Sequence, residues 1–353
     1  MNEKISVLVV DDSAVSRQFM AYLIESDPAL QVIGMAEDGE KGLKFLEESI
    51  QKPDVIIMDI VMPKMNGFET TRKIMSTTPL PIIIVSSVYS SQEVELCYQA
   101  LSAGAIAVLE KPVGIQDPRY AEMGHAIIQA IKSLARFKPK AITASERTVD
   151  LSSKKPFLTI PPAKPKNVKI DMIGIGASLG GPKAIKTILS ALPATFPVPI
   201  IVIQQISVGF TQGLVSWLAQ ACALKVKLAS LGEVIHAGTI YIAPDNYHLE
   251  ITTGNVIKLS SSPPENGCRP SIDRLFLSMA LQLPSRGVGI LLSGRGNDGI
   301  DGLAAIKKNG GMTIVQNEET SVLFDKQQKA IQAEAVVKIL PLEQIAHFLE
   351  TLV

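Results

Sequence analysis

Short apolar runs alternate with amphipathic stretches along residues 1–137. The runs are residues 5–10, 55–58, 82–85 and 106–109. Each is followed by polar side chains, and after the first run Val15, Phe19 and Leu23 recur at helical spacing until Pro28. Because buried strands that alternate with helices form a parallel sheet covered on both faces, this pattern predicts a doubly wound α/β domain.

The same pattern returns in residues 168–353. Its apolar runs are residues 170–175, 200–203, 241–243, 288–292 and 313–315. A Gly-rich turn follows the first run, and a helix is expected from about Lys183. We therefore predict a second doubly wound parallel sheet. Polar side chains again lie at the carboxyl ends of its strands, the edge where open α/β sheets bind ligands.

A segment without either periodicity separates the two halves. Residues 138–169 contain five prolines and many lysines but no apolar stripe. Such segments stay extended and solvated. The sequence therefore predicts a domain at 1–137, a linker at 138–167 and a second domain at 168–353.

The composition argues against several kinds of partner and indicates the cellular compartment. The 34 basic and 34 acidic residues cancel, so no global positive field favours nucleic acid as the main partner. Cys97, Cys222 and Cys268 form no CxxC pair, which argues against a zinc site and a disulfide scaffold. No apolar run approaches the ~18 residues of a membrane span, and the N-terminus is unlike a signal peptide. We expect a cytoplasmic protein without membrane insertion, a monomer by default.

Charged or hydroxyl side chains end four successive predicted strands of the first domain. Asp11 and Asp12 end the first, Asp59 the second, Ser86 the third and Lys111 the fourth. Such a carboxylate cluster suits Mg²⁺, and the cation and the lysine together suit a phosphoryl group. A strand-end Asp can also simply begin a turn or cap a helix, but that explanation is weak for four strand ends at once.

The motifs VLVVDDS, VIIMDIVMPKMNGFE, PIIIVSS and GAIAVLEKP resemble the receiver domain of bacterial response regulators. The resemblance covers about residues 3–125 and implies a flavodoxin-like fold. It also implies that Asp59 accepts the phosphoryl group from a histidine kinase. The same resemblance implies that Asp11, Asp12 and Asp59, with the backbone of Val61, bind Mg²⁺.

The receiver resemblance also implies a switch. Ser86 and Lys111 would couple the phosphate to a rearrangement of the surface. The family often has an aromatic residue three positions before the lysine, and here that residue is Val108. We therefore expect a switching surface that depends less on that side chain.

The Gly-rich turn of the second half, residues 174–182, reads GIGASLGGP. A dinucleotide-binding loop would need glycine where Leu179 stands and an acidic residue about 20 positions later, so that interpretation is weak. Gly176, Ser178 and Gly180 instead match the G-x-S-x-G turn that exposes a nucleophilic serine beside helix amides. A serine that merely caps the helix is an equally good explanation of this motif alone.

A nucleophilic serine needs a base and an orienting acid. Asp298, in LLSGRGNDGIDG, is the candidate acid. The chain has four histidines, of which His125 lies in the first half and His347 in the last helix. His248 lies between Ser178 and the acid in sequence and remains open as the base.

Six motifs of the second half resemble the catalytic domain of the chemotaxis protein-glutamate methylesterase (CheB) family. They are IGASLGGP, VIQQISVGFT, GTIYIAPDNYHL, CRPSIDRLF, LLSGRGNDGIDG and QNEETSVLF. The resemblance runs from about residue 168 to the end and implies a Rossmann-like three-layer domain. It implies hydrolysis of glutamate methyl esters on chemoreceptors, and in some members glutamine deamidation. Ser178 would be the nucleophile and Asp298 the acid, and no cofactor is expected there.

Three positions depart from the CheB pattern. Gln205 stands where the family has its catalytic histidine, and losing that base costs on the order of 10⁴–10⁶ in rate. Arg295 replaces a methionine and would stabilise an oxyanion or pair with Asp298. Cys268 replaces a histidine that often precedes R-P-S.

Two hypotheses follow from these residues. In the first, the unphosphorylated receiver covers the active-site edge, and phosphorylation of Asp59 opens it to methylated chemoreceptor segments. In the second, the C-terminal domain is a pseudo-methylesterase that binds a partner under receiver control. Gln205 favours the second hypothesis, whereas intact Ser178 and Asp298 favour the first.

Overall fold

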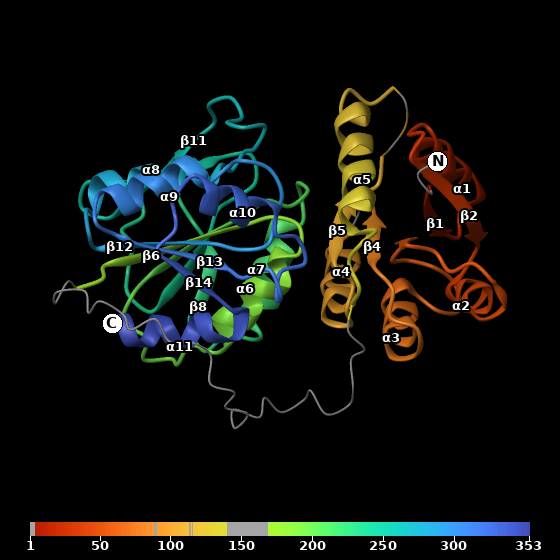
Figure 1. Ribbon diagram of the computed structural model, residues 1–353, viewed down its shortest axis with the longest axis horizontal. Coiled ribbons are helices and arrows are strands. Elements are labelled where there is room, and N and C mark those ends of the chain that lie inside the picture. The colour runs from red at the N-terminus through yellow and green to blue at the C-terminus, as the bar shows by residue number, and fades with distance from the viewer. Residues whose placement is uncertain (1–3, 88–89, 113, 115, 140–168) are drawn as a thin grey trace.

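The computed structural model describes residues 4–87, 90–112, 114, 116–139 and 169–353, which form two α/β domains (Figure 1). The fold class predicted from the sequence is confirmed. The predicted linker, 138–167, lies almost wholly outside the described residues. None of the described helices is long and apolar enough to cross a membrane.

The N-terminal domain is a five-stranded parallel sheet with strand order β2-β1-β3-β4-β5. Its elements are β1 (Ile5–Val10), α1 (Ala14–Glu25), β2 (Leu30–Ala36), α2 (Gly39–Glu48), β3 (Val55–Met58), α3 (Gly67–Thr77), β4 (Ile82–Ser86), α4 (Ser91–Ser102), β5 (Ala107–Glu110) and α5 (Tyr120–Leu134). Helices α1 and α5 pack on one face, and α2, α3 and α4 cover the other. This is the flavodoxin-like arrangement of a doubly wound sheet.

The C-terminal domain is a seven-stranded parallel sheet with strand order β14-β13-β12-β6-β7-β9-β8, joined by a hairpin of β10 and β11. Its elements are β6 (Met172–Ala177), α6 (Gly181–Ser190), β7 (Ile200–Gln204), α7 (Thr211–Ala219), β8 (Lys225–Leu228), β9 (Thr239–Ile242), β10 (His248–Thr252), β11 (Val256–Ser260), α8 (Ile272–Gln282), β12 (Gly287–Leu291), α9 (Ile300–Lys308), β13 (Met312–Gln316), α10 (Asp325–Gln332), β14 (Lys338–Leu340) and α11 (Leu342–Leu352).

The strand order of this sheet reverses beside β6. The chain runs from β6 to β7 on one side, and β12 later pairs with β6 on the other. Helices α6, α7 and α11 pack on one face, and α8, α9 and α10 on the opposite face (Figure 1). The loops after β6, β7 and β12 therefore meet at a topological switch point, where doubly wound sheets bind ligands.

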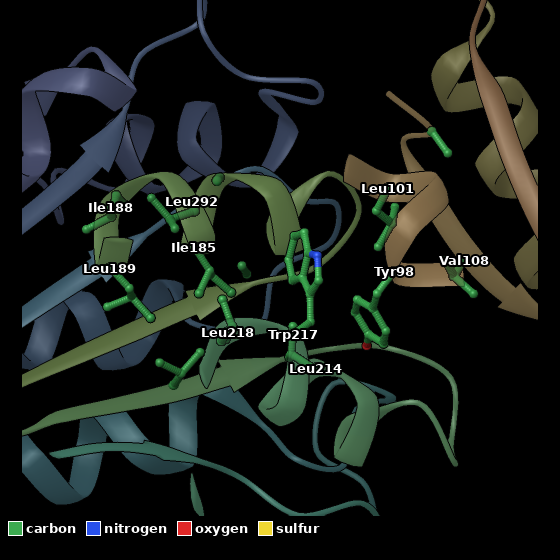
Figure 2. Close-up of a cluster of buried hydrophobic side chains, with 14 of the residues drawn as sticks. Tyr98, Leu101, Val108, Ile185, Ile188, Leu189, Leu214, Trp217, Leu218 and Leu292 are labelled. Carbon is green, nitrogen blue, oxygen red and sulfur yellow. The ribbon is translucent and has the colours of Figure 1, made fainter. Parts of the chain in front are cut away.

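The two domains meet where α4 packs against α7. Figure 2 shows Tyr98 and Trp217 facing each other across this contact, with ring centroids 5.4 Å apart. The Tyr98 hydroxyl donates to the carbonyl of Phe210 at 2.9 Å, and Trp217 Nε1 donates to Ser102 Oγ at 2.9 Å. Gly213 lies beneath Tyr98, and a Cβ there would come within 2.7 Å of the tyrosine ring. The two domains are thus joined by packed aromatic rings whose polar O–H and N–H groups are hydrogen-bonded.

Candidate functional site

The acidic residues of the N-terminal domain gather at one edge of its sheet. Val10 of β1 pairs with Met58 of β3, so the carboxylates that follow these strands are brought side by side. Asp11, Asp12 and Asp59 each offer an oxygen, and these oxygens lie within 4.8 Å of one another. The parallel register is therefore what assembles the cluster.

Lys111 neutralises this cluster from the end of β5. Its Nζ contacts Asp11 Oδ2 at 2.7 Å and Asp59 Oδ2 at 2.6 Å. Burial raises the pKa of the Asp59 carboxyl, although Lys111 acts in the opposite direction. Ser86 is buried at the end of β4, and its hydroxyl donates to the carbonyl of Ser87. The structure thus brings the four predicted strand ends to one place.

The donor set of this edge fits a divalent cation. Three carboxylates within 4.8 Å are hard oxygen ligands of the kind that Mg²⁺ prefers. Val61 follows Asp59 by two residues, and its side chain is exposed. The residues present therefore suit magnesium.

Ser178 follows β6 in a tight turn at the switch point of the C-terminal sheet. Gly180 has φ +77°, a left-handed conformation that favours glycine, and it precedes the first turn of α6. The backbone of Gly294 lies very close to this serine. A Cβ on Gly294 would come within 2.3 Å of Ser178 Oγ, so only glycine fits here. The backbone N–H of Arg295 donates to Ser178 Oγ at 3.1 Å. The hydroxyl is thus held beside the loop after β12.

Asp298 lies in that loop, only 1% exposed, against the N-terminus of α8. Its Oδ1 accepts from the Ser271 hydroxyl at 2.6 Å and the Asp273 backbone N–H at 3.1 Å. Its Oδ2 accepts from the Ile272 backbone N–H at 2.7 Å. Helix N-terminal amides stabilise a carboxylate in this position, so the charge of Asp298 is well compensated without a cationic side chain.

Gln205 lies between Asp298 and a lysine. Its Nε2 donates to Asp298 Oδ2 at 2.5 Å, and its Oε1 accepts from Lys326 Nζ at 3.2 Å. A carboxylate only accepts hydrogen bonds and an ammonium only donates them. The Gln205 amide nitrogen therefore points to Asp298, and its oxygen points to Lys326. The amide of Gln205 therefore bridges Asp298 and Lys326.

Sequence reasoning missed Lys326, the second residue of α10. Its side chain is 0% exposed, and its Nζ also donates to the backbone carbonyl of Asp298 at 2.9 Å. Burial lowers the pKa of its ammonium group. In sequence this residue stands in a polar helix, DKQQKAIQ, where a lysine is normally solvated. Only the approach of α10 to the loop after β12 reveals it.

His248 is not placed to act as the base. It is fully buried, its Nδ1 accepts from the Ser271 backbone N–H at 3.2 Å, and its Nε2 lies 3.0 Å from the Pro263 carbonyl. A carbonyl only accepts, so Nε2 carries the proton and both ring nitrogens are engaged by backbone. The hypothesis that His248 serves Ser178 is therefore wrong in this conformation.

The structure also places Arg295 and Cys268, the two other residues that depart from the CheB pattern. The Arg295 guanidinium donates to Gln129 Oε1 on α5 of the N-terminal domain, so it does not pair with Asp298 as we had considered. Cys268 lies at the mouth of the site, and burial raises the pKa of its thiol to about 11. Cys268 is therefore a protonated, unreactive thiol at neutral pH.

A cavity of about 460 Å³ lies between the two domains and reaches Gln205. Arg119 and Met123, from the start of α5, line it on the receiver side, and Cys268 lines the opposite side. The backbone N–H of Glu110 also donates to Ser207 Oγ across this boundary at 3.2 Å. The N-terminal domain therefore borders the serine-bearing edge of the C-terminal sheet.

These features define an α/β domain with a carboxylate cluster and a lysine at one sheet edge, joined to a doubly wound domain with a serine turn at its switch point. Residues 7–119 match the response regulator receiver domain, and residues 173–349 match the CheB methylesterase domain. The chain is 41% identical to protein-glutamate methylesterase/protein-glutamine glutaminase 1 of Syntrophus aciditrophicus, over 98% of this chain and 97% of that protein.

Two further comparisons agree. The corresponding protein of Nitrosospira multiformis is 40% identical over 99% of this chain and 97% of its own length. The crystal structure of the Thermotoga maritima CheB methylesterase catalytic domain is 34% identical and covers 53% of this chain and 100% of its own, with a TM-score of 0.51. This chain belongs to the CheB methylesterase family and carries an N-terminal response regulator receiver domain.

Proposed function

We propose that this protein is a phosphorylation-controlled protein-glutamate methylesterase that acts on methylated chemoreceptor segments in chemotaxis adaptation. The observation that carries the proposal is the position of Ser178. It lies half-buried in a glycine turn at the switch point, directly beside the Asp298 loop. Relatives that match the full chain are named for the same esterase activity and for glutamine deamidation, so we include the amide reaction.

Receiver phosphorylation supplies the control. Asp59 accepts the phosphoryl group from a histidine kinase, and Lys111, already 2.6 Å from its Oδ2, then pairs with the phosphoryl oxygens. Asp11, Asp12 and Asp59, with the Val61 backbone, would hold Mg²⁺, which neutralises charge on the transferring group when bound.

Ester hydrolysis takes place at the C-terminal sheet edge. Ser178 Oγ attacks the ester carbonyl of a methylated glutamate, methanol leaves, and water releases the free carboxylate. The amides at the start of α6 lie next to the serine and suit the developing oxyanion. Asp298 keeps Gln205 in one orientation through the 2.5 Å hydrogen bond.

The receiver blocks the site in the unphosphorylated chain. Arg295, whose backbone contacts the serine, is tied by its side chain to Gln129 of α5. The α4–α7 contact through Tyr98 and Trp217 holds the same arrangement closed. Phosphorylation that weakens these contacts shifts the population toward an open form.

Methanol release from a methylated chemoreceptor segment tests the proposal. With a small-molecule phosphodonor and Mg²⁺, the wild type should release methanol faster than without them. Ser178→Ala should release none above background, and Asp59→Asn should keep the slow basal rate under both conditions. Equal rates for wild type and Ser178→Ala would contradict the proposal.

The second candidate, a phosphorylation-controlled binding module without turnover, is favoured by one observation. Gln205 stands where the CheB family has its catalytic histidine, and an amide does not take a proton near neutral pH. In that case the receptor segment binds wild type and Ser178→Ala equally, and neither releases methanol.

A further inference from the structure

We infer that Lys326 is the general base that activates Ser178 in this chain, so that a serine–lysine pair replaces serine–histidine. The inference deepens the proposed function and rests on it for the identity of the ester substrate. It is carried by the proximity of the two side chains, the burial of the amine and the acceptors that surround it.

The loop after β12 brings Ser178 and Lys326 close to each other. Ser178 Oγ lies 2.3 Å and Lys326 Cε 3.2 Å from the point that a Cβ on Gly294 would occupy. The serine hydroxyl and the end of the lysine side chain therefore both border the space that Gly294, which has no side chain, leaves open. The Lys326 backbone N–H donates to the Gly294 carbonyl at 3.2 Å, so α10 is anchored to this same loop.

The acceptors of Lys326 are uncharged. Its Nζ donates to the Gln205 amide oxygen at 3.2 Å and to the Asp298 backbone carbonyl at 2.9 Å. Both carboxylate oxygens of Asp298 accept from other donors. A fully buried ammonium with only neutral acceptors is destabilised relative to the free amine, because burial penalises the charged form.

The other titratable groups that face Lys326 are also engaged elsewhere. Asp273, on α8, accepts from the backbone N–H of Gly302 at 2.7 Å, and burial raises its pKa to about 6. Asp325, on α10, accepts from Lys329 Nζ at 3.0 Å. Cys268 and Asp298 complete the set. Burial outweighs all of them, and the pKa of Lys326 is lowered.

Gln205 acts here as a positioning residue. Its amide is fixed by Asp298 and presents its oxygen to Lys326, so it orients the amine without exchanging a proton. Through Gln205, Asp298 thus helps to orient Lys326, as the third group of a catalytic triad orients the base.

The proton balance is simple. The neutral amine of Lys326 takes the proton of Ser178 as Oγ forms a bond to the ester carbonyl carbon. The resulting ammonium returns that proton to the departing methoxide, which leaves as methanol. Water then attacks the acyl-serine, with Lys326 again taking and returning a proton, and the glutamate carboxylate is released.

The test measures two rates in the full chain with phosphodonor and Mg²⁺. One is phosphonylation of Ser178 by a fluorophosphonate, followed by intact mass, and the other is methanol release. Lys326→Met should slow both by on the order of 10²–10⁴-fold, the usual contribution of a general base. Lys326→Arg, which keeps charge and donors but does not deprotonate, should be equally slow. Lys308→Met, at an exposed lysine of α9, is the matched control and should react like wild type.

A pH profile and a rescue separate a base from a structural role. The wild-type phosphonylation rate should rise through an inflection below 10.5, the ordinary pKa of lysine, and this inflection should vanish in Lys326→Met. Adding Gln205→His to Lys326→Met should restore rate by returning the family's imidazole. Full rate in Lys326→Met or Lys326→Arg, or no rescue by Gln205→His, would overturn the inference.

The two proposals fail in different ways. If Ser178 is phosphonylated in a Lys326-dependent manner but no methanol is released from the receptor segment, the assigned substrate is wrong and the base assignment stands. If methanol release depends on Ser178 but not on Lys326, the function stands and the base assignment is wrong.

Discussion

The hydroxyl of Tyr98 offers a clean perturbation of the contact that holds the receiver over the active site. Tyr98→Phe keeps the ring that packs on Trp217 and removes only the hydrogen bond to the Phe210 carbonyl, 2.9 Å long. That carbonyl still accepts from the Leu214 backbone N–H, so it is not left unpaired. The closed form should therefore lose about 1 kcal/mol, the net value of one such bond.

A loss of that size corresponds to about a fivefold shift toward the open form. We expect the basal methanol-release rate without phosphodonor to rise about fivefold, with an unchanged rate when Asp59 is phosphorylated. Tyr22→Phe, the same substitution at an exposed tyrosine of α1, is the control. If phosphodonor stimulates the wild type strongly while Tyr98→Phe has the wild-type basal rate, the α4–α7 contact does not control access.

Three further predictions concern the interface, the receiver and the buried lysine. Gly213→Ala places a Cβ 2.2 Å from the Val94 side chain, so it should raise basal ester hydrolysis more than Tyr98→Phe does, and an unchanged basal rate would contradict this. Asp59→Asn or removal of Mg²⁺ with a chelator should abolish acid-labile phosphate on the chain, and label that persists in Asp59→Asn would refute the acceptor assignment. The pKa of Lys326 is lower in the folded chain than in the unfolded one, so the unfolded chain binds more protons between the two values. The free energy of unfolding of wild type relative to Lys326→Met should therefore increase as pH rises toward 10.5, measured by urea unfolding at neutral and alkaline pH, and a constant difference would show that burial does not destabilise the ammonium.

Much of the fold followed from the apolar runs, because strands of a covered parallel sheet are apolar along their whole length. The predicted runs coincide with strands to within a few residues, and the doubly wound class is confirmed. Strands β2, β8 and β14 were missed because their burial is only partial, as the pattern of Lys225–Leu228 illustrates. Edge strands lose the continuous apolar signal when one side faces solvent.

Some residues of the candidate sites could be predicted from the sequence, and others could not. Asp59 and Lys111 were predictable because parallel strands place their carboxyl ends at one edge, and the structure brings both together. Lys326 was not predictable, because nothing in a polar helix marks which lysine turns inward. Its burial depends on the approach of α10 to Gly294, a contact between segments that only the folded sheet brings together.

We propose that the serine of this site turns over without the family's histidine. The most direct measurement is the number of methanol molecules that each phosphorylated wild-type chain releases from a methylated receptor segment. We predict many per chain, and none above background for Ser178→Ala. A wild-type yield equal to that of Ser178→Ala would contradict the account.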